Sequence, residues 1–313
     1  MSICLRIVVA LGLLLLAATA RPGNSSAGDC SEAVYPESVS KSAESIYSTI
    51  FVYQSGPCVK MTFRRVGSEF DESEMNLADP RELPIPYTRT ITAALLYPDR
   101  VDRVAMIGVG GGTILNYLSH YLPGADYVGV ELDPKVLEFA RNDFRLAANR
   151  RIRLVESDGR LFLLRNREQY DVIMLDAFRG GYIPSHLLTR EFYELARKRL
   201  TPGGALAINV HDGNALFDST LRTIGEVFPQ VDTYWDGGSV IVVGSNRRIG
   251  REALLGNALR LQGEHGFRYP LEEILATRKE FVVPATAELL TDDFSPANQL
   301  AEINTINVVK RSK

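Results

Sequence analysis

The chain has 313 residues, of which 45% are hydrophobic and 23% are charged, and its formal net charge is −3. This composition is typical of a globular protein with one large domain, or a large and a small one. Domains that grip nucleic acids usually carry a basic face, and 35 basic against 38 acidic residues argue against a nucleic acid partner. Only one apolar run approaches the length of a membrane span, which excludes a multispanning transporter.

That apolar run lies at the N-terminus. Arg6 precedes it, residues 7–18 are almost entirely apolar, and residues 18–20 have the small-x-small sequence ATA. The pattern predicts a secretory signal peptide over residues 1–20, and hence a protein exported to the periplasm or secreted. The alternative is an uncleaved anchor that leaves the protein bound to the membrane, although the run is shorter than the roughly 20 residues of a spanning helix.

Residues 21–43 begin with a stretch rich in Gly, Ser and Asn, which is typical of a flexible linker. Cleavage after Ala20 would leave Cys30 and Cys58 as the two cysteines of the mature chain. In an oxidising compartment this pair can form a disulfide, and two free thiols are the alternative. No Cys-x-x-Cys or His/Cys cluster is present, so we expect no metal site.

A small N-terminal β-domain is predicted over residues 44–86. Within it, residues 45–63 alternate apolar and polar side chains on both sides of Ser55-Gly56-Pro57. Period-two alternation around a Gly-Pro turn is the pattern of a β-hairpin.

Residues 87–313 are predicted to form one larger domain that alternates strands and helices. A helix is expected over residues 87–97, and Asp133-Pro134 supplies the N-cap and first position of another. Such alternation predicts an α/β fold, a Rossmann-like, methyltransferase-type parallel sheet. An Asp-Gly-Gly turn predicts that the sheet ends in an antiparallel hairpin. The expected strands are residues 103–109, 127–131, 152–156, 171–175 and 205–210, followed by the hairpin strands 231–235 and 239–244.

The first strand leads into a glycine cluster, Gly108-Val109-Gly110-Gly111-Gly112. Glycines at such a turn let a ligand approach the backbone at the start of the next helix. Glu131 ends the second strand, 23 positions after Gly108, where a carboxylate can accept hydrogen bonds from both ribose hydroxyls. The glycine turn and Glu131 together predict a nucleoside site.

Two further acids follow the next strands. Asp158-Gly159 comes after the third strand, where a carboxylate can accept a hydrogen bond from an adenine amino group, and Asp176 ends the fourth. Open α/β sheets bind ligands outside the carboxyl ends of their strands, so we expect these acids to line one crevice with Glu131. His186 and His211 lie near the same strand ends, and we expect them to have surface or capping roles.

Several motifs make the chain similar to the polyamine aminopropyltransferase (spermidine synthase) family. It most resembles the bacterial spermidine synthase-like branch that is often fused to membrane segments, and the resemblance covers about residues 44–296. The motifs are residues 176–193 (DAFRGGYIPSHLLTREFY), residues 200–204 (LTPGG), Glu44-Ser45-x-Tyr47, Tyr87-Thr88-Arg89 and Thr291-Asp292-Asp293.

The resemblance implies a transferase that binds decarboxylated S-adenosylmethionine and moves its aminopropyl group to an amine, putrescine in the family. It also implies frequent homodimers. By resemblance, Asp176 is the catalytic carboxylate and Tyr87 lines the acceptor site. The nucleoside contacts would come from Gly108, Gly110, Glu131, Asp158 and Gly159.

Three acids that the family places near the acceptor are absent here. Arg179 stands at the second acid of the family's Asp-x-x-Asp pair, Gly111 at the acid of its glycine turn, and Arg89 at the Glu of its Tyr-x-Glu motif. A diamine is a dication at neutral pH and favours an acidic site. We therefore expect Arg89 and Arg179 to select a different acceptor, such as one that carries a carboxylate.

Three functions stay open from the sequence. The first is aminopropyl transfer to a small-molecule amine acceptor. The second is an S-adenosylmethionine-dependent methyltransferase that uses the same crevice. The third is a noncatalytic nucleoside-binding relative, which export favours because adenosylsulfonium donors are made in the cytoplasm.

Overall fold

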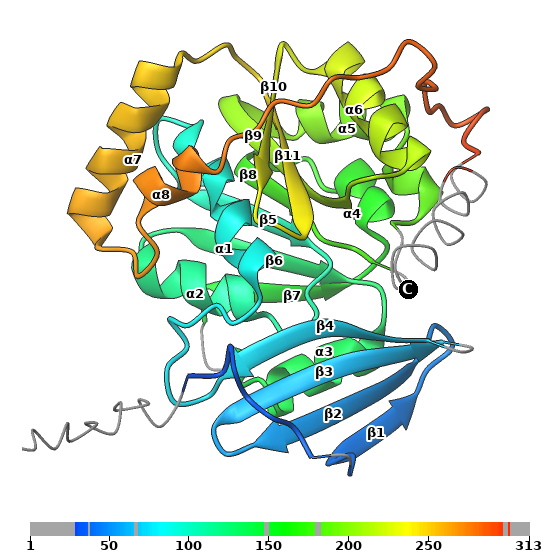
Figure 1. Cartoon of the computed structure of the whole chain (residues 1–313), viewed down its shortest axis with the longest axis vertical. Coiled ribbons are helices and arrows are strands. Elements are labelled where there is room, and N and C mark those ends of the chain that lie inside the picture. The colour runs from blue at the N-terminus through cyan, green and yellow to red at the C-terminus, as the bar shows by residue number, and fades with distance from the viewer. Residues whose placement is uncertain are drawn as a thin grey trace, which may run out of the picture.

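A computed structural model describes residues 29–36, 38–65, 68–146, 150–178, 183–296 and 300. The chain forms a small sheet and a large sheet, and the small sheet lies below the large one in Figure 1. The small sheet is antiparallel, in the order β1-β2-β3-β4. Its strands are β1 (Lys41–Glu44), β2 (Thr49–Ser55), β3 (Cys58–Arg65) and β4 (Ser68–Asn76).

The large sheet has seven strands in the order β10-β11-β9-β8-β5-β6-β7. Strands β5 to β9 run parallel, and the hairpin β10-β11 joins β9 antiparallel. The strands are β5 (Arg103–Ile107), β6 (Asp126–Glu131), β7 (Ile152–Glu156), β8 (Tyr170–Leu175), β9 (Leu200–His211), β10 (Gln230–Trp235) and β11 (Ser239–Ser245). This topology confirms the predicted parallel sheet with a terminal hairpin.

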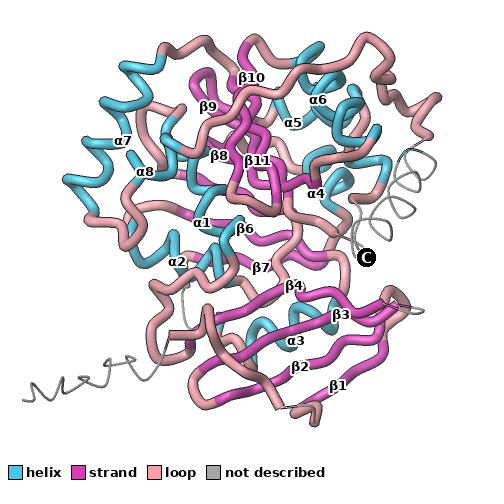
Figure 2. Tube along the Cα trace, in the orientation of Figure 1, coloured by secondary structure: helices cyan, strands magenta, loops and turns pink. Residues whose placement is uncertain are grey.

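Helices cover both faces of the large sheet, as the tube in Figure 2 also shows. The helices η1, α2, α7 and α8 pack on one face of the sheet and form a buried hydrophobic cluster with it. The helices α4, α5 and α6 pack on the other face and form a second cluster. The helices are α1 (Pro86–Thr90), η1 (Ile91–Leu96), α2 (Thr113–Tyr121), α3 (Pro134–Asn142), α4 (Gly159–Arg165), η3 (Ser185–Leu187), α5 (Arg190–Lys198), α6 (Ala215–Val227), α7 (Arg251–His265) and α8 (Leu271–Ala276).

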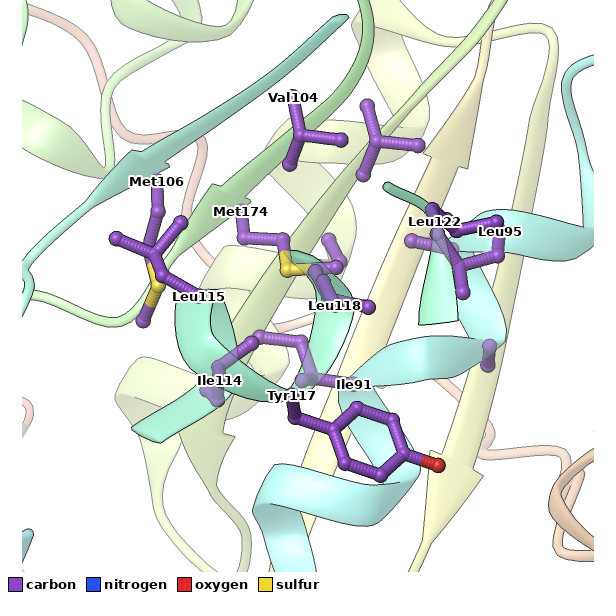
Figure 3. Packing of buried hydrophobic residues seen from close by; sticks show 14 of the residues in the cluster. Ile91, Leu95, Val104, Met106, Ile114, Leu115, Tyr117, Leu118, Leu122 and Met174 are labelled. Atoms are coloured by element: carbon purple, nitrogen blue, oxygen red, sulfur yellow. The ribbon is translucent and has the colours of Figure 1, made fainter. Parts of the chain in front are cut away.

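Alternate side chains of each central strand enter opposite clusters. Val104 and Met106 of β5 pack on the side of α2, whereas Ala105 and Ile107 pack on the side of α4. Figure 3 shows the first side, with Val104, Met106 and Met174 near the leucines of α2. Because both faces are covered, the strands are apolar throughout, which is why the sequence showed them as continuous apolar runs.

The small sheet is held to the larger domain through α3. Val136 and Phe139 of α3 share a buried cluster with Ile50 of β2 and Met61 of β3. Polar contacts join the same surfaces, since the Ser45 hydroxyl donates a hydrogen bond to Asp133. The two sheets are therefore packed together around α3.

Several expected boundaries differ from the structure, and among the strands β5 ends at Ile107 rather than at residue 109 and β9 begins at Leu200 rather than at residue 205. The expected linker over residues 21–43 ends too late, because β1 begins at Lys41 and pairs with β2. The helix expected over residues 87–97 is instead the short helix α1 followed by the 3₁₀ helix η1. Every residue of η1 is buried, so tertiary packing on all sides, rather than an amphipathic period, decides its conformation.

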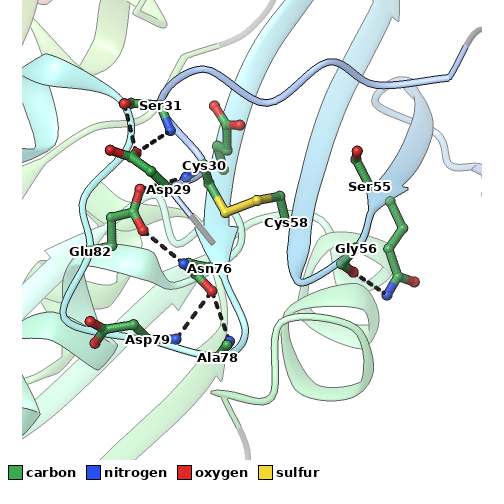
Figure 4. The surroundings of a disulfide bond; sticks show 12 residues. Asp29, Cys30, Ser31, Ser55, Gly56, Cys58, Asn76, Ala78, Asp79 and Glu82 are labelled. Atoms are coloured by element: carbon green, nitrogen blue, oxygen red, sulfur yellow. Dashed lines mark hydrogen bonds between the residues drawn. A yellow bond between two sulfur atoms is a disulfide. The ribbon is translucent and has the colours of Figure 1, made fainter. Parts of the chain in front are cut away.

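A disulfide joins Cys30 to Cys58 at the start of β3, with a Cα–Cα distance of 5.5 Å. This decides between the bridge and the two free thiols that the sequence left open. Figure 4 shows Glu82 beside the bridge. Glu82 is buried, and its two oxygens accept hydrogen bonds from the Cys30 backbone N–H at 2.7 Å and from Asn76 Nδ2 at 2.8 Å.

The described residues include no helix long and apolar enough to cross a membrane. The predicted signal peptide, residues 1–20, lies outside the described residues.

Candidate active site

A cavity lies at the carboxyl ends of β5, β6, β7 and β8, on the side of the large domain that faces the small sheet. It holds about 1060 Å³ of space that protein atoms do not fill, part of it open to solvent. The predicted residues Gly108, Gly110, Glu131, Asp158, Gly159, Asp176 and Tyr87 all line it. The small sheet adds Tyr47, Ser48, Phe63 and Ser73.

The glycine turn brings the backbone of β5 close to that of β8. Gly108 has a φ of +85°, and a Cβ on it would lie 2.2 Å from the carbonyl oxygen of Asp176. Only glycine fits such a position, because it tolerates positive φ and has no side chain. The turn therefore holds Asp176 beside the start of α2.

Gly111 occupies a position with no room for a side chain. A Cβ there would lie 2.4 Å from Cδ1 of Phe144, whose ring is fully buried. The Gly111 backbone N–H donates to Ser73 Oγ of the small sheet at 2.8 Å. An acidic side chain at this position would therefore collide with Phe144.

Glu131 is held by backbone donors on both sides. Its Oε2 accepts from the N–H of Val109 at 3.0 Å and Gly110 at 3.5 Å. Its Oε1 accepts from Leu132 at 2.8 Å and Asp133 at 3.1 Å. Burial raises the pKa of Glu131, and the four N–H bonds oppose this effect. These bonds fix the carboxylate at the edge of the cavity, between the glycine turn and α3.

Asp158 forms the N-cap of α4 and contacts a histidine. Its Oδ1 accepts from the Leu161 N–H at 2.9 Å, and its Oδ2 lies 2.7 Å from Nε2 of His186. Burial raises the pKa of Asp158, but the His186 and Leu161 bonds outweigh it and leave the pKa below its ordinary value. Beside it, a Cβ on Gly159 would lie 2.2 Å from Cγ2 of Ile107, so this position also requires glycine.

Asp176 lies at the end of β8 and is held by two side chains. Its Oδ2 accepts from the Tyr87 hydroxyl at 2.9 Å, and its Oδ1 accepts from Asn209 Nδ2 at 3.0 Å. Burial raises the pKa of Asp176, and the bonds from Asn209 and Tyr87 oppose the increase. A buried carboxylate with a raised pKa is a stronger base than a carboxylate in water.

The sequence predicts two arginines, Arg89 and Arg179, at the acceptor site. The interpretation of Arg89 is wrong, because its Nε donates to the Leu83 carbonyl at 2.7 Å and its guanidinium lies 4.5 Å from the centre of the Tyr269 ring. The Arg89 guanidinium thus donates its hydrogen bonds to backbone carbonyls near α1, outside the cavity. Arg179 lies outside the described residues.

Some site residues were not predicted. Asn209 lies within the otherwise apolar second half of β9, so nothing in the pattern singled it out. Its side chain is buried, and its Oδ1 accepts no hydrogen bond from the described residues. His186 lines the cavity at Asp158, whereas His211 packs its ring 5.0 Å from that of Phe178. Tyr47 belongs to the Glu44-Ser45-x-Tyr47 motif, whereas Ser48, Phe63 and Ser73 gave no signal in the sequence, because only long-range packing brings them to the cavity.

Among the described residues, no group of three or more His, Cys, Asp or Glu side chains is placed to hold a metal ion. The cavity has carboxylate acceptors at the ends of three strands of the large sheet, β6, β7 and β8, with β5 between β8 and β6.

Comparisons with known proteins agree with this geometry. Residues 86–236 match the family model described as the spermine/spermidine synthase domain. A polyamine aminopropyltransferase of Vibrio vulnificus is 28% identical over 277 residues, which cover 82% of this chain and 89% of that protein. One of Chromobacterium violaceum is 33% identical over 164 residues, which cover 52% of this chain and 63% of that protein.

Solved structures share the fold. A probable spermidine synthase from Corynebacterium glutamicum has a TM-score of 0.63 and 21% identity, and the match covers 83% of this chain and 98% of that one. Human methyltransferase-like protein 13 in complex with SAH has a TM-score of 0.52 and 22% identity, with coverage of 64% and 97%.

The fold and the cavity define a methyltransferase-like α/β protein with a carboxylate-lined cavity at the carboxyl ends of its strands. Within this class, the chain is similar to the spermine/spermidine synthase domain over residues 86–236 and to polyamine aminopropyltransferases over most of its length.

Proposed function

We propose that the protein is a transferase that moves an aminopropyl group from decarboxylated S-adenosylmethionine to an amine. The observation that supports this most is the order of three carboxylates around one cavity. Glu131 ends β6, Asp158 and Asp176 follow β7 and β8, and all three carboxylates line the same cavity. In this arrangement Glu131 binds the ribose, Asp158 binds the adenine amino group and Asp176 faces the reacting amine.

The charge of the cavity supports the decarboxylated donor over S-adenosylmethionine. The α-carboxylate of S-adenosylmethionine would need a cation or several donors around it. Among the lining residues that the structure describes, none is Lys or Arg and four are Asp or Glu. An acidic cavity suits a donor whose side chain ends in an ammonium group.

The chemical step is an in-line displacement. The lone pair of the acceptor amine forms a bond to the aminopropyl carbon beside the sulfonium, and the carbon–sulfur bond breaks. Its electron pair passes to sulfur, so methylthioadenosine leaves as a neutral thioether. Asp176 takes the proton that the new ammonium group releases, and the hydrogen bonds from Tyr87 and Asn209 hold its carboxylate in place.

We infer from the sequence position of Arg179 that the acceptor is an amine whose far end is not a second ammonium group. With Arg89 turned away and Gly111 packed against Phe144, Asp176 is the acid that we assign to the attacking amine. Arg179 follows Asp176 by three positions in the sequence, where the family has an acid. We therefore expect an amine that carries a carboxylate to be a better acceptor than putrescine, and competition between the two in an aminopropyl transfer assay tests this.

Calorimetric titration of the purified protein with three ligands tests the donor. Tighter binding of decarboxylated S-adenosylmethionine than of S-adenosylmethionine, together with binding of methylthioadenosine, is the expected result. The reverse preference would support methyl transfer. Failure of all three ligands to bind would support a noncatalytic relative.

We also infer that the protein works outside the cytoplasm, either exported or anchored by its N-terminal segment. The disulfide between Cys30 and Cys58 supports this location, because such bridges persist mainly in oxidising compartments. Fractionation of native cells checks the inference, and recovery of the protein in the cytosol would contradict it. Homodimer formation stays a prediction that light scattering on the purified protein can measure.

A further inference from the structure

The loop Thr291-Asp292-Asp293-Phe294 has no role in the function proposed above, yet it lies beside the cavity. It comes at the end of an extended segment that passes over α6. Leu290 anchors this segment, since it is fully buried and its N–H donates to Thr223 Oγ1 at 3.0 Å. The loop is therefore fixed to the core on one side.

On its other side, the loop contacts α4, the helix that Asp158 caps. Asp292 receives two parallel hydrogen bonds from the guanidinium of Arg160, the second residue of α4. Arg160 Nη1 donates to Asp292 Oδ1 at 2.6 Å, and Nη2 donates to Oδ2. Bidentate pairs of this kind fix the direction of both side chains. The Arg160 guanidinium also holds the pKa of Asp292 below its ordinary value.

Arg160 in turn contacts the segment around His186, which lines the cavity beside Asp158. Its Nη1 donates to the backbone carbonyl of His186 at 3.1 Å. The side chain of His186 reaches Asp158 Oδ2 at 2.7 Å. A continuous set of contacts thus runs from Asp292 through Arg160 and His186 to the carboxylate assigned to the base.

Further bonds hold the same segment to the loop. Asp292 Oδ1 accepts from the hydroxyl of Thr189 at 2.8 Å, and the Asp292 N–H donates to Glu191 Oε2 at 2.9 Å. The Arg190 N–H donates to the Leu290 carbonyl at 2.8 Å. Residues 183–189, which lead into α5, contain only the three-residue helix η3, so these contacts with the loop help to hold their position.

We propose that Asp292 is a positioning residue for the base of the bound nucleoside. It fixes Arg160, which holds the main chain at His186, and His186 then keeps the Asp158 carboxylate as an acceptor for an exocyclic amino group. The site consequently prefers a 6-amino purine to a 6-oxo purine, which has no such donor at that position. This proposal rests on the assignment of the cavity to a nucleoside.

The first test compares Asp292→Asn with Asp293→Asn, the adjacent acid. Asn keeps the size of the side chain but removes the charge and one of the two acceptors. Asp292→Asn should weaken methylthioadenosine binding on the order of tenfold in calorimetry, as expected for loss of a charge-assisted pair. Methylthioinosine binding should change by less than about twofold, and Asp293→Asn should leave both affinities within about twofold of the wild type. Equal losses for both nucleosides in Asp292→Asn would overturn the proposal.

A double-mutant cycle separates action through His186 from a general effect on stability. If Asp292 acts through His186, then Asp292→Asn should cost little further methylthioadenosine affinity in a His186→Ala background. Additive losses would show that Asp292 does not act through His186.

Hydrogen exchange measures the same contacts without any ligand. Backbone amides of residues 183–190 should exchange faster in Asp292→Asn than in Asp293→Asn or the wild type, while the strands of the large sheet stay unchanged. Unchanged exchange in residues 183–190 would refute the positioning role. If the exchange effect appears but the wild type binds no nucleoside, then the proposed function is wrong and the structural role of Asp292 still holds.

Discussion

The hydroxyl of Tyr87 donates a hydrogen bond to Asp176 Oδ2 at 2.9 Å, although the two residues are 89 positions apart. Tyr87 belongs to α1, which leads into the large domain, and Asp176 directly follows β8. The second oxygen of Asp176 accepts from Asn209 on β9. Both oxygens are thus oriented by residues from separate elements, so the carboxylate faces the cavity in one direction.

Replacement of Asp176 by Asn should reduce turnover by about 100-fold or more, because the amide cannot accept the proton of the attacking amine. The affinity for methylthioadenosine should stay within about twofold, since Asp176 lies away from the ribose and base positions. Single-turnover kinetics and calorimetry measure the two effects. Asp212→Asn is a matched control, because Asp212 follows β9 at the same edge of the sheet but does not line the cavity. An active Asp176→Asn enzyme would remove Asp176 from the mechanism.

Removal of the Tyr87 hydroxyl should move the acid side of the pH profile to higher pH. Burial raises the pKa of Asp176, whereas the bonds from Asn209 and Tyr87 lower it, so Tyr87→Phe raises the pKa further. The reaction needs the ionised carboxylate, and activity is lost as the pH falls through this pKa. Measurement of kcat/KM against pH for both proteins checks the direction. A shift toward lower pH would contradict the assignment of this limb to Asp176.

Glu131→Gln should weaken both nucleoside binding and the fold. A Gln amide would direct its own N–H groups at backbone N–H donors that now bond a carboxylate oxygen. We expect a loss of about 1–3 kcal/mol in the free energy of unfolding and at least roughly tenfold weaker methylthioadenosine binding. Glu156→Gln is the control, because Glu156 pairs with Glu131 in the sheet but is exposed and outside the cavity. Urea denaturation and calorimetry give the two quantities.

Gly111→Ala should destabilise the protein by about 1–3 kcal/mol, because the added Cβ would lie 2.4 Å from the Phe144 ring. Phe144→Leu makes space at the same place and has its own cost. If the collision is the cause, the double variant should be more stable than the sum of the two single effects predicts. Chemical denaturation of the four proteins measures this coupling, and strict additivity would show that Phe144 does not exclude a side chain at Gly111.

Loss of the disulfide should destabilise the fold without altering the site. Cys30 and Cys58 are 28 positions apart, and a bridge that closes a loop of this length contributes about 3 to 4 kcal/mol in the chain-entropy account. The double variant Cys30→Ser/Cys58→Ser should lose about this amount in urea denaturation. Its affinity for methylthioadenosine should stay within about twofold, since neither cysteine lines the cavity. A large loss of affinity would show that the bridge also shapes the site.

The sequence alone determined the succession of strands along the chain and the places of Glu131, Asp158 and Asp176 at or after the strand ends. Buried parallel strands appear as apolar runs, and the residue after each run must lie at the carboxyl edge of the sheet. Local patterns therefore carry this information. The glycine turn was visible for the same reason, since a positive φ at Gly108 requires glycine whatever surrounds it.

Only the tertiary structure decided what surrounds those acids. The direction of Arg89 depends on carbonyls and a ring that lie outside the cavity, and the lack of space for a side chain at Gly111 depends on Phe144 of a later segment. The contacts of Asp292 with Arg160 join residues 132 positions apart. These features result from packing between distant elements, for which the composition and periodicity of a single segment hold no signal.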